Sequence, residues 1–255
     1  MKKVIYIRLG SLLMLVILSI CIIISINKIY KWDIDNKKNK LVKNEIQNTA
    51  IIYKTEKSEI SSDISNGEGD YEINFANLKE TNKDIVGWLD VPNTNIKYPV
   101  VKAKDNSYYL THNFSGEYNY GGWIFADYSN NCDGSDKNLV IYGHNVRDNS
   151  MFGSLKNILE EKWYNDENNY NITFMTENKN DIYRVFSIYK IEAEDYYIQT
   201  KFKDNNAFEE FANKIKERSI KNFDVQVGAE DSILTLSTCA NNNKYRVVLH
   251  AKKMQ

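Results

Sequence analysis

A run of eighteen residues without a charge, from Leu9 to Ile26, limits most strongly what this chain can fold into. It reads LGSLLMLVILSICIIISI and follows a basic segment, residues 1–8. An uncharged apolar stretch of this length is typical of a membrane-spanning helix, whereas the core of a cleaved signal peptide is shorter. No small-x-small cleavage site follows it, so we expect an uncleaved signal-anchor, with residues 9–26 as the span and residues 1–8 as a short tip in front of it.

The segment after the span leaves the orientation open. Six lysines follow the span before residue 44, against three basic residues in front of it, and the positive-inside rule would keep the rest of the chain in the cytoplasm. Long domains, however, translocate largely regardless of charge. Residues 27–70 are rich in Lys, Asn and Glu and include a loop-like segment at 61–69. We expect a stalk there, with a helix that packs on a partner as the alternative.

Composition excludes several classes of protein. The 255 residues, 42% of them hydrophobic, suffice for one sizeable domain with appendages. The net charge of -1, without a basic cluster, argues against a nucleic-acid binder. The three cysteines, Cys21, Cys132 and Cys239, have no metal-ligand spacing and are too few for a disulfide framework. We therefore expect neither a metal site nor a nucleic-acid partner.

Strand-like runs recur through the rest of the chain, separated by turn signals. About eight such runs predict a mainly β fold, a closed or nearly closed barrel. Helical patterns occur at 71–82, 153–163 and 204–220; the last must lie outside the barrel, and Asn206 followed by Glu209 suggests its start. The predicted strands are 86–91, 96–101, 122–126, 139–142, 171–175, 182–191, 233–239 and 245–250.

The strand from Ile233 to Cys239 ends on a thiol, followed by a polar turn over residues 240–244. Residues alternate faces along a strand, so Thr235, Ser237 and Cys239 share one side. A thiol at the end of a strand, beside a loop, is well placed for a nucleophile on a rigid support. The alternative is a small buried core cysteine, which is the commoner fate of a free thiol.

A thiolate attacks far better than a thiol, so a nearby proton acceptor or cation is expected. His112 lies in an aromatic loop, His250 in the last strand, and His144 at the end of the most apolar strand, directly after Gly143. His144 is the best placed of the three, although it could be a partly buried turn histidine. Arg246 could offer a planar donor fork to a developing oxyanion, or it could be an ordinary surface charge.

Several motifs together resemble those of sortases, the cysteine transpeptidases of Gram-positive cell surfaces. Thr235-Leu-Ser-Thr-Cys239 is similar to the TLxTC motif of that family. Tyr142-Gly-His-Asn145, the downstream Met151-Phe-Gly-Ser-Leu155 and the arginine after the cysteine follow in the family's order. The resemblance covers roughly residues 71–253. Three segments are similar to class B in particular: 96–101, 105–110 and 122–127.

The resemblance implies a closed eight-stranded sortase barrel with peripheral helices as a catalytic domain over residues 71–255. It implies Cys239 as nucleophile, His144 as acid/base and Arg246 as the oxyanion or substrate-positioning group. It also implies an extracellular domain on a single-pass membrane protein. After the cysteine this chain has Ala-Asn-Asn-Asn at 240–243, where class B members often carry an acidic residue. We therefore do not expect an acidic contact with the substrate there. The implied sorting-signal groove comprises Asn106, Leu110, Tyr197, Ile198, Ser237 and Thr238.

The reaction that the resemblance implies is transpeptidation without a cofactor. Cys239 would attack the threonine carbonyl in the C-terminal sorting signal of a secreted surface protein. An amine of a peptidoglycan precursor in the cell wall would then resolve the thioacyl intermediate. Two rival classes remain: a cysteine peptidase that gives the acyl group to water, and a non-catalytic surface protein with a Cys132–Cys239 disulfide.

Overall fold

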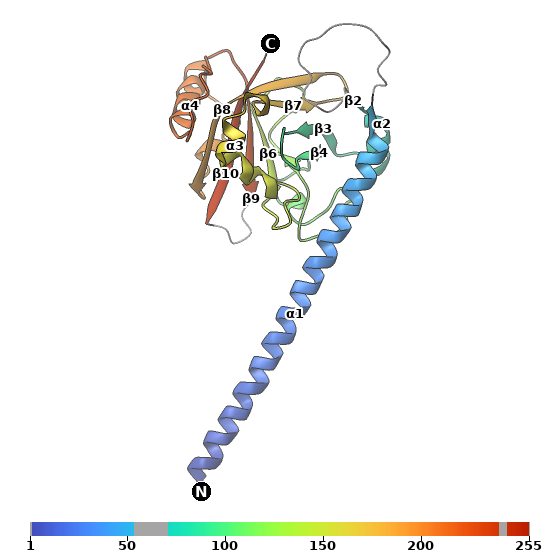
Figure 1. The fold of residues 1–255 in the computed structure, drawn as a ribbon, viewed down its shortest axis with the longest axis vertical. Coiled ribbons are helices and arrows are strands. Elements are labelled where there is room, and N and C mark those ends of the chain that lie inside the picture. The colour runs from blue at the N-terminus through green and yellow to red at the C-terminus, as the bar shows by residue number, and fades with distance from the viewer. Residues whose placement is uncertain (1, 54–70, 240–243, 255) are drawn as a thin grey trace.

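A computed structural model describes residues 2–53, 71–239 and 244–254 of the chain (Figure 1). Eight strands close into a barrel in the order β10-β8-β7-β3-β4-β5-β6-β9, as the sequence predicts. The pairs β4–β5 and β6–β9 are parallel and the others antiparallel. The strands are β3 (Ile85–Asp90), β4 (Lys97–Val101), β5 (Phe125–Ala126), β6 (Asn138–His144), β7 (Asn171–Met175), β8 (Asn180–Glu192), β9 (Ile233–Cys239) and β10 (Tyr245–Lys253).

Strands β6 and β9 form a part of the barrel that is buried on both faces. Every residue of β6 is buried, and so is every residue of β9 before Cys239. Strands covered on both faces read as continuous apolar runs, which explains the Leu-Val-Ile and Ile-Leu-Thr-Leu sequences of this pair. The rigid pair ends at the edge of the barrel, where each strand presents its last residue to the loops.

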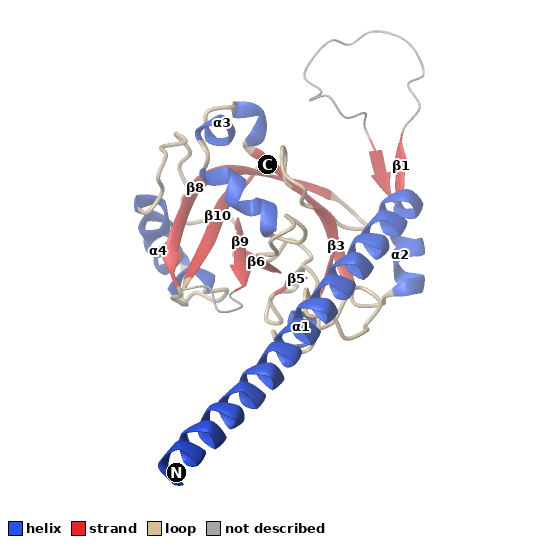
Figure 2. Cartoon of the chain, turned by 60° about the horizontal axis from the view of Figure 1, so that its bottom comes forward, coloured by secondary structure: helices blue, strands red, loops and turns tan. Residues whose placement is uncertain are grey.

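The helices surround the barrel, and their bounds correct several predictions (Figure 2). The segment expected as one helix at 71–82 starts as a strand, β2 (Tyr71–Ile73), which pairs with β1 (Ile51–Tyr53), and continues as α2 (Phe75–Thr81). The segment at 153–163 is a 3₁₀ helix, η2 (Gly153–Leu159), followed by a short α3 (Glu161–Tyr164). The remaining 3₁₀ turns are η1 (Tyr108–Leu110), η3 (Glu167–Asn169) and η4 (Tyr196–Ile198).

Helix α4 (Asn205–Glu217) lies on the outside of the barrel, as expected. Its apolar face, with Phe208 and Ile215, packs against residues of β8, β9 and β10 in a second hydrophobic cluster. The predicted start at Asn206 is wrong. The side chain of Asp204 accepts a hydrogen bond from the backbone N–H of Ala207, which makes Asp204 the N-cap.

Helix α1 (Lys2–Ala50) differs most from expectation, because it continues unbroken from the apolar span into the segment expected as a stalk. Its first half contains an 18-residue window of mean hydropathy 2.6, none of it buried, and is compatible with a single membrane span. Its last part packs against the barrel domain (Figure 1). There the side chains of Lys43 and Gln47 donate to the backbone carbonyls of Asn95 and Lys97, at 2.8 and 3.3 Å.

The expected stalk is therefore helical up to Ala50, and the alternative, a helix that packs, describes residues 36–50. Apolar spacing there is weak because the contacts with the barrel are largely polar, and tertiary packing rather than local pattern stabilises such a helix. The loop predicted at 61–69 lies outside the described residues.

Candidate active site

The parallel register of β6 and β9 places His144 directly opposite Cys239. Both are the last residues of their strands, so two rigid supports hold the two residues on neighbouring strand ends at the edge of the barrel. A backbone hydrogen bond from Gly143 to the thiol of Cys239 reinforces this pairing. The structure thus brings together the thiol and the histidine that the sequence singled out.

His144 is buried, and its ring orientation is set by the backbone. The Nε2 atom lies 2.7 Å from the carbonyl oxygen of Leu110. A carbonyl oxygen can only accept, so Nε2 carries the proton in the neutral ring and Nδ1 is left as the basic atom. Within the described residues, Nδ1 has no hydrogen-bond partner. Burial lowers the pKa of His144, while the hydrogen bond to Leu110 acts in the opposite direction.

The resting thiol of Cys239 is neutral. Burial raises its pKa to about 12, and the charge of Arg246 and the Gly143 hydrogen bond only partly counter this effect. An uncharged thiol beside an uncharged imidazole can become an ion pair by moving one proton between them. The site therefore holds a nucleophile and its base in a state that needs activation.

Arg246 lies at the start of β10, close to the thiol. β10 pairs with β9 from Val248 opposite Ser237, and the same register continued by two residues brings Arg246 level with Cys239. Arg246 is half-buried, and its charge lowers the pKa of both Cys239 and Tyr197. A cation beside the thiol is compatible with either expected role of Arg246, as a hydrogen-bond donor to an oxyanion or as a group that positions the substrate. The predicted turn over 240–244 falls mostly outside the described residues.

The other two histidines have different surroundings. His250 is fully buried: its Nδ1 contacts the hydroxyl of Thr235 and its Nε2 that of Tyr189, both at 2.8 Å. The Thr235 hydroxyl donates to Asn138 Oδ1 at 2.7 Å, so it accepts from His250 Nδ1, and Nε2 accepts from Tyr189. Both ring nitrogens of His250 are therefore engaged, on the face of the sheet that packs against α4 rather than in the barrel interior. His112 stacks on Tyr108, with ring centroids 4.1 Å apart.

The predicted groove residues fall into two groups. Leu110 holds His144 through its carbonyl, and Tyr197 hydrogen-bonds the hydroxyl of Ser237 at 3.0 Å, near Arg246 and Cys239. Half-buried Ile198 follows Tyr197 in η4. Thr238 is buried, and its hydroxyl accepts from the backbone N–H of Val247 at 3.0 Å.

The side chain of Asn106 is held by a carboxylate rather than by one of the three proposed catalytic residues: its amide donates to Asp127 at 2.8 Å. Tyr142 donates to the same Asp127 carboxylate at 2.9 Å. Burial, followed by the charge of Asp127, raises the pKa of Tyr142, and Cys239 contributes to the same shift. Sequence reasoning missed Asp127 and Tyr142, although both lie inside segments quoted for the resemblance.

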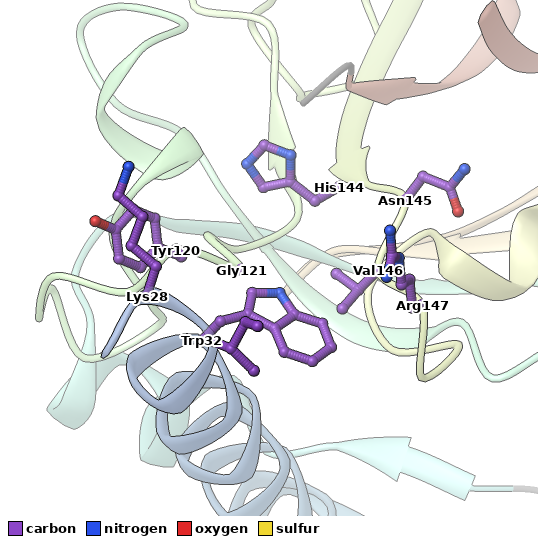
Figure 3. A pocket seen from close by; sticks show the side chains of 9 residues that line it. Lys28, Trp32, Tyr120, Gly121, His144, Asn145, Val146 and Arg147 are labelled. Atoms are coloured by element: carbon purple, nitrogen blue, oxygen red, sulfur yellow. The ribbon is translucent and has the colours of Figure 1, made fainter. Parts of the chain in front are cut away.

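A pocket of about 630 Å³ opens beside His144 (Figure 3). Helix α1 contributes Lys28 and Trp32 to its lining, and the barrel domain contributes Tyr120, His144 and Arg147. Helix α1 is therefore part of the surroundings of the site, which the sequence did not predict.

The structure rules out the Cys132–Cys239 disulfide, and both thiols are free. Cys132 lies near the beginning of β6, where its backbone N–H binds Asp136, while Cys239 lies beside the end of β6. Six residues of strand separate these ends, roughly 20 Å at about 3.3 Å per residue. A disulfide requires Cα atoms within about 7 Å of each other. The non-catalytic alternative loses its chemical basis.

Comparison with known proteins agrees with this geometry. A family model for the sortase domain matches residues 89–254. Sortase B of Listeria monocytogenes is 38% identical over 193 residues, which cover 74% of this chain and 77% of the relative. Sortase B of Staphylococcus aureus is 38% identical over 183 residues, covering 70% and 73%.

Solved structures give the same result. The sortase B of Bacillus anthracis in complex with AAEK1 superposes with a TM-score of 0.74 at 35% identity, covering 87% of this chain and 99% of that one. The Staphylococcus aureus sortase B–substrate complex gives a TM-score of 0.67 at 36% identity, covering 71% and 84%. With its barrel, its paired thiol and imidazole, and these relatives, the chain belongs to the sortase family, as a class B member.

Proposed function

We propose that Cys239, His144 and Arg246 carry out the transpeptidation for which sortases are known. The observation that carries this proposal is the β6–β9 register, which sets His144 opposite Cys239 at the edge of the barrel. Sortases act on sorting-signal peptides and on cell-wall amine acceptors. For this chain we propose surface proteins with a C-terminal sorting signal as donors and a peptidoglycan precursor amine as acceptor.

The first half-reaction forms a thioacyl enzyme. The proton of Cys239 passes to His144, and the sulfur attacks the threonine carbonyl carbon. Arg246 donates to the oxygen on which negative charge builds. When the intermediate collapses, the C–N bond breaks and the leaving amine takes the proton from the His144 imidazolium. The products are the thioacyl enzyme and the released C-terminal peptide.

The second half-reaction reverses these roles. The acceptor amine loses a proton to His144 and attacks the thioacyl carbon. A new amide bond forms, the C–S bond breaks, and the sulfur of Cys239 recovers the proton from His144. The neutral resting thiol and imidazole are restored, which matches the raised pKa of Cys239 and the lowered pKa of His144.

We propose that the groove residues bind the sorting signal on the side of the site where Tyr197 and Ser237 lie. Their hydrogen bond and their proximity to Arg246 support this placement. Leu110, Asn106, Ile198 and Thr238 would complete the groove. We further propose that residues 9–26 cross the cell membrane once, with residues 1–8 in the cytoplasm and the domain at 71–255 outside.

Substitution of the base tests the assignment. We expect His144→Ala to abolish turnover of sorting-signal peptides, because no other proton acceptor in the described part of the chain lies opposite the thiol in the strand register. His112→Ala is the matched control, since its ring stacks on Tyr108 away from this pairing, and it should keep most activity. Peptide cleavage followed by mass spectrometry measures both. Equal losses in the two variants would overturn the role of His144.

Product analysis separates transpeptidation from hydrolysis. With a panel of sorting peptides and an added glycine-based amine, we expect the amide product to increase with amine concentration. If water remained the sole acceptor at millimolar amine, the chain would be a peptidase of sortase fold.

A further inference from the structure

Helix α1 contacts the barrel through a buried polar cluster that reaches the immediate surroundings of His144. Asn39 of α1 is 2% exposed and Asn119 of the barrel is fully buried. The Asn39 side-chain amide donates to Asn119 Oδ1 at 3.0 Å and to the Gly122 carbonyl at 3.2 Å. An amide nitrogen has two hydrogens, so these two bonds use both. A flipped amide would set its oxygen against two acceptors, which fixes the orientation shown here.

The turn over residues 119–122 is held by α1 at further points. The side chain of Asn119 donates to the carbonyl of Asp35 at 2.9 Å, and the backbone N–H of Tyr120 donates to the Asp35 carboxylate at 3.1 Å. The Oδ1 atom of Asn119 also accepts from the backbone of Gly121 at 2.8 Å. The helix therefore fixes both ends of this turn.

The opposite side of the same turn contacts the histidine. Gly122 has a φ of 53°, and a Cβ atom there would lie 2.9 Å from His144 Cδ2 and 2.8 Å from the Leu110 carbonyl oxygen. That oxygen is the acceptor for His144 Nε2. Gly122 thus touches the ring and its hydrogen-bond partner at once, and only a residue without a side chain fits. A shift of the turn would displace both.

We propose that Asn39 of the anchor helix is a positioning residue for His144, acting through the Gly122 peptide. The proposal rests on the proposed role of His144 as acid/base. The hydrogen bonds of Asn39 go to Asn119 and to the Gly122 carbonyl, so it holds the backbone that supports the ring. Small misplacements of a catalytic group reduce rate strongly, about a hundredfold for about 1 Å. The anchor helix would then contribute to catalysis as well as to attachment.

The test compares Asn39→Leu with Gln47→Leu in the full-length chain, purified in detergent. Leu replaces the amide at similar volume and removes both donors. Gln47 is the matched control, because it also donates an amide hydrogen from α1 to a barrel carbonyl, that of Lys97 in β4. With the sorting peptide that the parent turns over fastest, we expect kcat of Asn39→Leu to fall at least about tenfold, with KM within about twofold. Gln47→Leu should match the parent.

A spectroscopic readout distinguishes positioning from general destabilisation. The chain has three histidines, so ¹⁵N-histidine labelling gives few ring signals. In the parent, the His144 ring should show the Nε2–H tautomer; in Asn39→Leu it should shift toward a tautomer mixture, while His250 stays unchanged. Unchanged His144 signals, or the same kcat loss in Gln47→Leu, would overturn the inference.

Gly122→Ala provides a second variant, should Asn39→Leu fail to fold. Its Cβ would clash with the Tyr109 carbonyl oxygen and lie 2.9 Å from His144 Cδ2, so the turn must shift against the ring; the same tautomer signals should change, and their constancy would also count against the inference. Failure of the proposed function looks different. It would appear as turnover surviving in His144→Ala, whatever the Asn39 variants do.

Discussion

The protonation state of Cys239 leads to a quantitative prediction about the resting enzyme. An ordinary cysteine has a pKa of about 8.5, so roughly 3% is thiolate at pH 7. Burial raises the pKa of Cys239 to about 12. At pH 7 about one molecule in 100,000 would then carry a thiolate, roughly 3,000-fold fewer. A thiolate of higher pKa is the more reactive nucleophile, which offsets part of this difference, so we expect the free enzyme to react with iodoacetamide about a hundredfold more slowly than an exposed cysteine.

The assay follows alkylation of Cys239 from pH 6 to 10.5 by intact-mass spectrometry. Cys21→Ser and Cys132→Ser in the same chain leave a single reactive thiol. The rate should rise about tenfold per pH unit, without a plateau below pH 10, because only the thiolate reacts. In that background His144→Ala should leave the rate within about twofold, since a neutral imidazole does not stabilise a thiolate. Arg246→Ala should slow it, because the arginine charge lowers the thiol pKa.

A plateau reached by pH 8 would refute this reasoning. It would show that the resting site already holds a thiolate–imidazolium pair, and a large loss of alkylation in His144→Ala would say the same. With the expected result, the ion pair forms only when substrate enters, and a low rate for the free thiol is compatible with an active enzyme.

Further predictions concern Arg246, His250 and the anchor. Arg246→Ala should reduce kcat for peptide transpeptidation about a hundredfold, or about 3 kcal/mol, and Arg246→Lys should also be badly impaired without the planar fork; parent-like rates in both would make Arg246 a surface charge. The pKa of His250 is about 3 in the fold against an ordinary 6.5, so its stabilisation is present above pH 6.5 and is lost as pH falls toward 3. Between pH 7 and 4.5 the parent should lose about 3 kcal/mol more unfolding free energy than His250→Gln in urea titrations, and parallel losses would contradict this. Protease added to intact protoplasts should remove the domain, and complete protection would reverse the proposed orientation.

The sequence predicted the strands well where their pattern is local. The bounds of β7 and β9 match the predicted runs, because polar residues stand at or next to both ends of each apolar run. The run expected at 122–126 shrinks to β5, Phe125–Ala126, because Gly122 takes a positive φ in the turn that contacts His144. A glycine in a strand-like run can mark such a close approach, and that signal was available.

The site was predicted as separate parts rather than as an arrangement. Family motifs named His144 and Cys239, but the parallel register that joins them is a pairing of distant segments, which no periodicity within either strand encodes. The missed contributors, Asn39 and Gly122, are short residues without an apolar pattern. The stalk was expected for the same reason: the contacts between α1 and the barrel are largely polar, so the sequence of α1 shows no periodic apolar pattern there.

The unbroken course of α1 has a consequence for reach. With the span at 9–26 in a bilayer, thirteen residues of helix separate Ile26 from Asn39, which is about 20 Å at about 1.5 Å per residue. A flexible linker of that length would have a similar average extension but would sample everything from contact to full stretch. If residues 9–26 cross the membrane as proposed, the helix would hold the site at one distance from the lipid. Each residue inserted between Asn27 and Asp35 would lengthen the helix by about 1.5 Å, so in the proposed orientation the length of the anchor would decide which layer of the envelope the enzyme reaches.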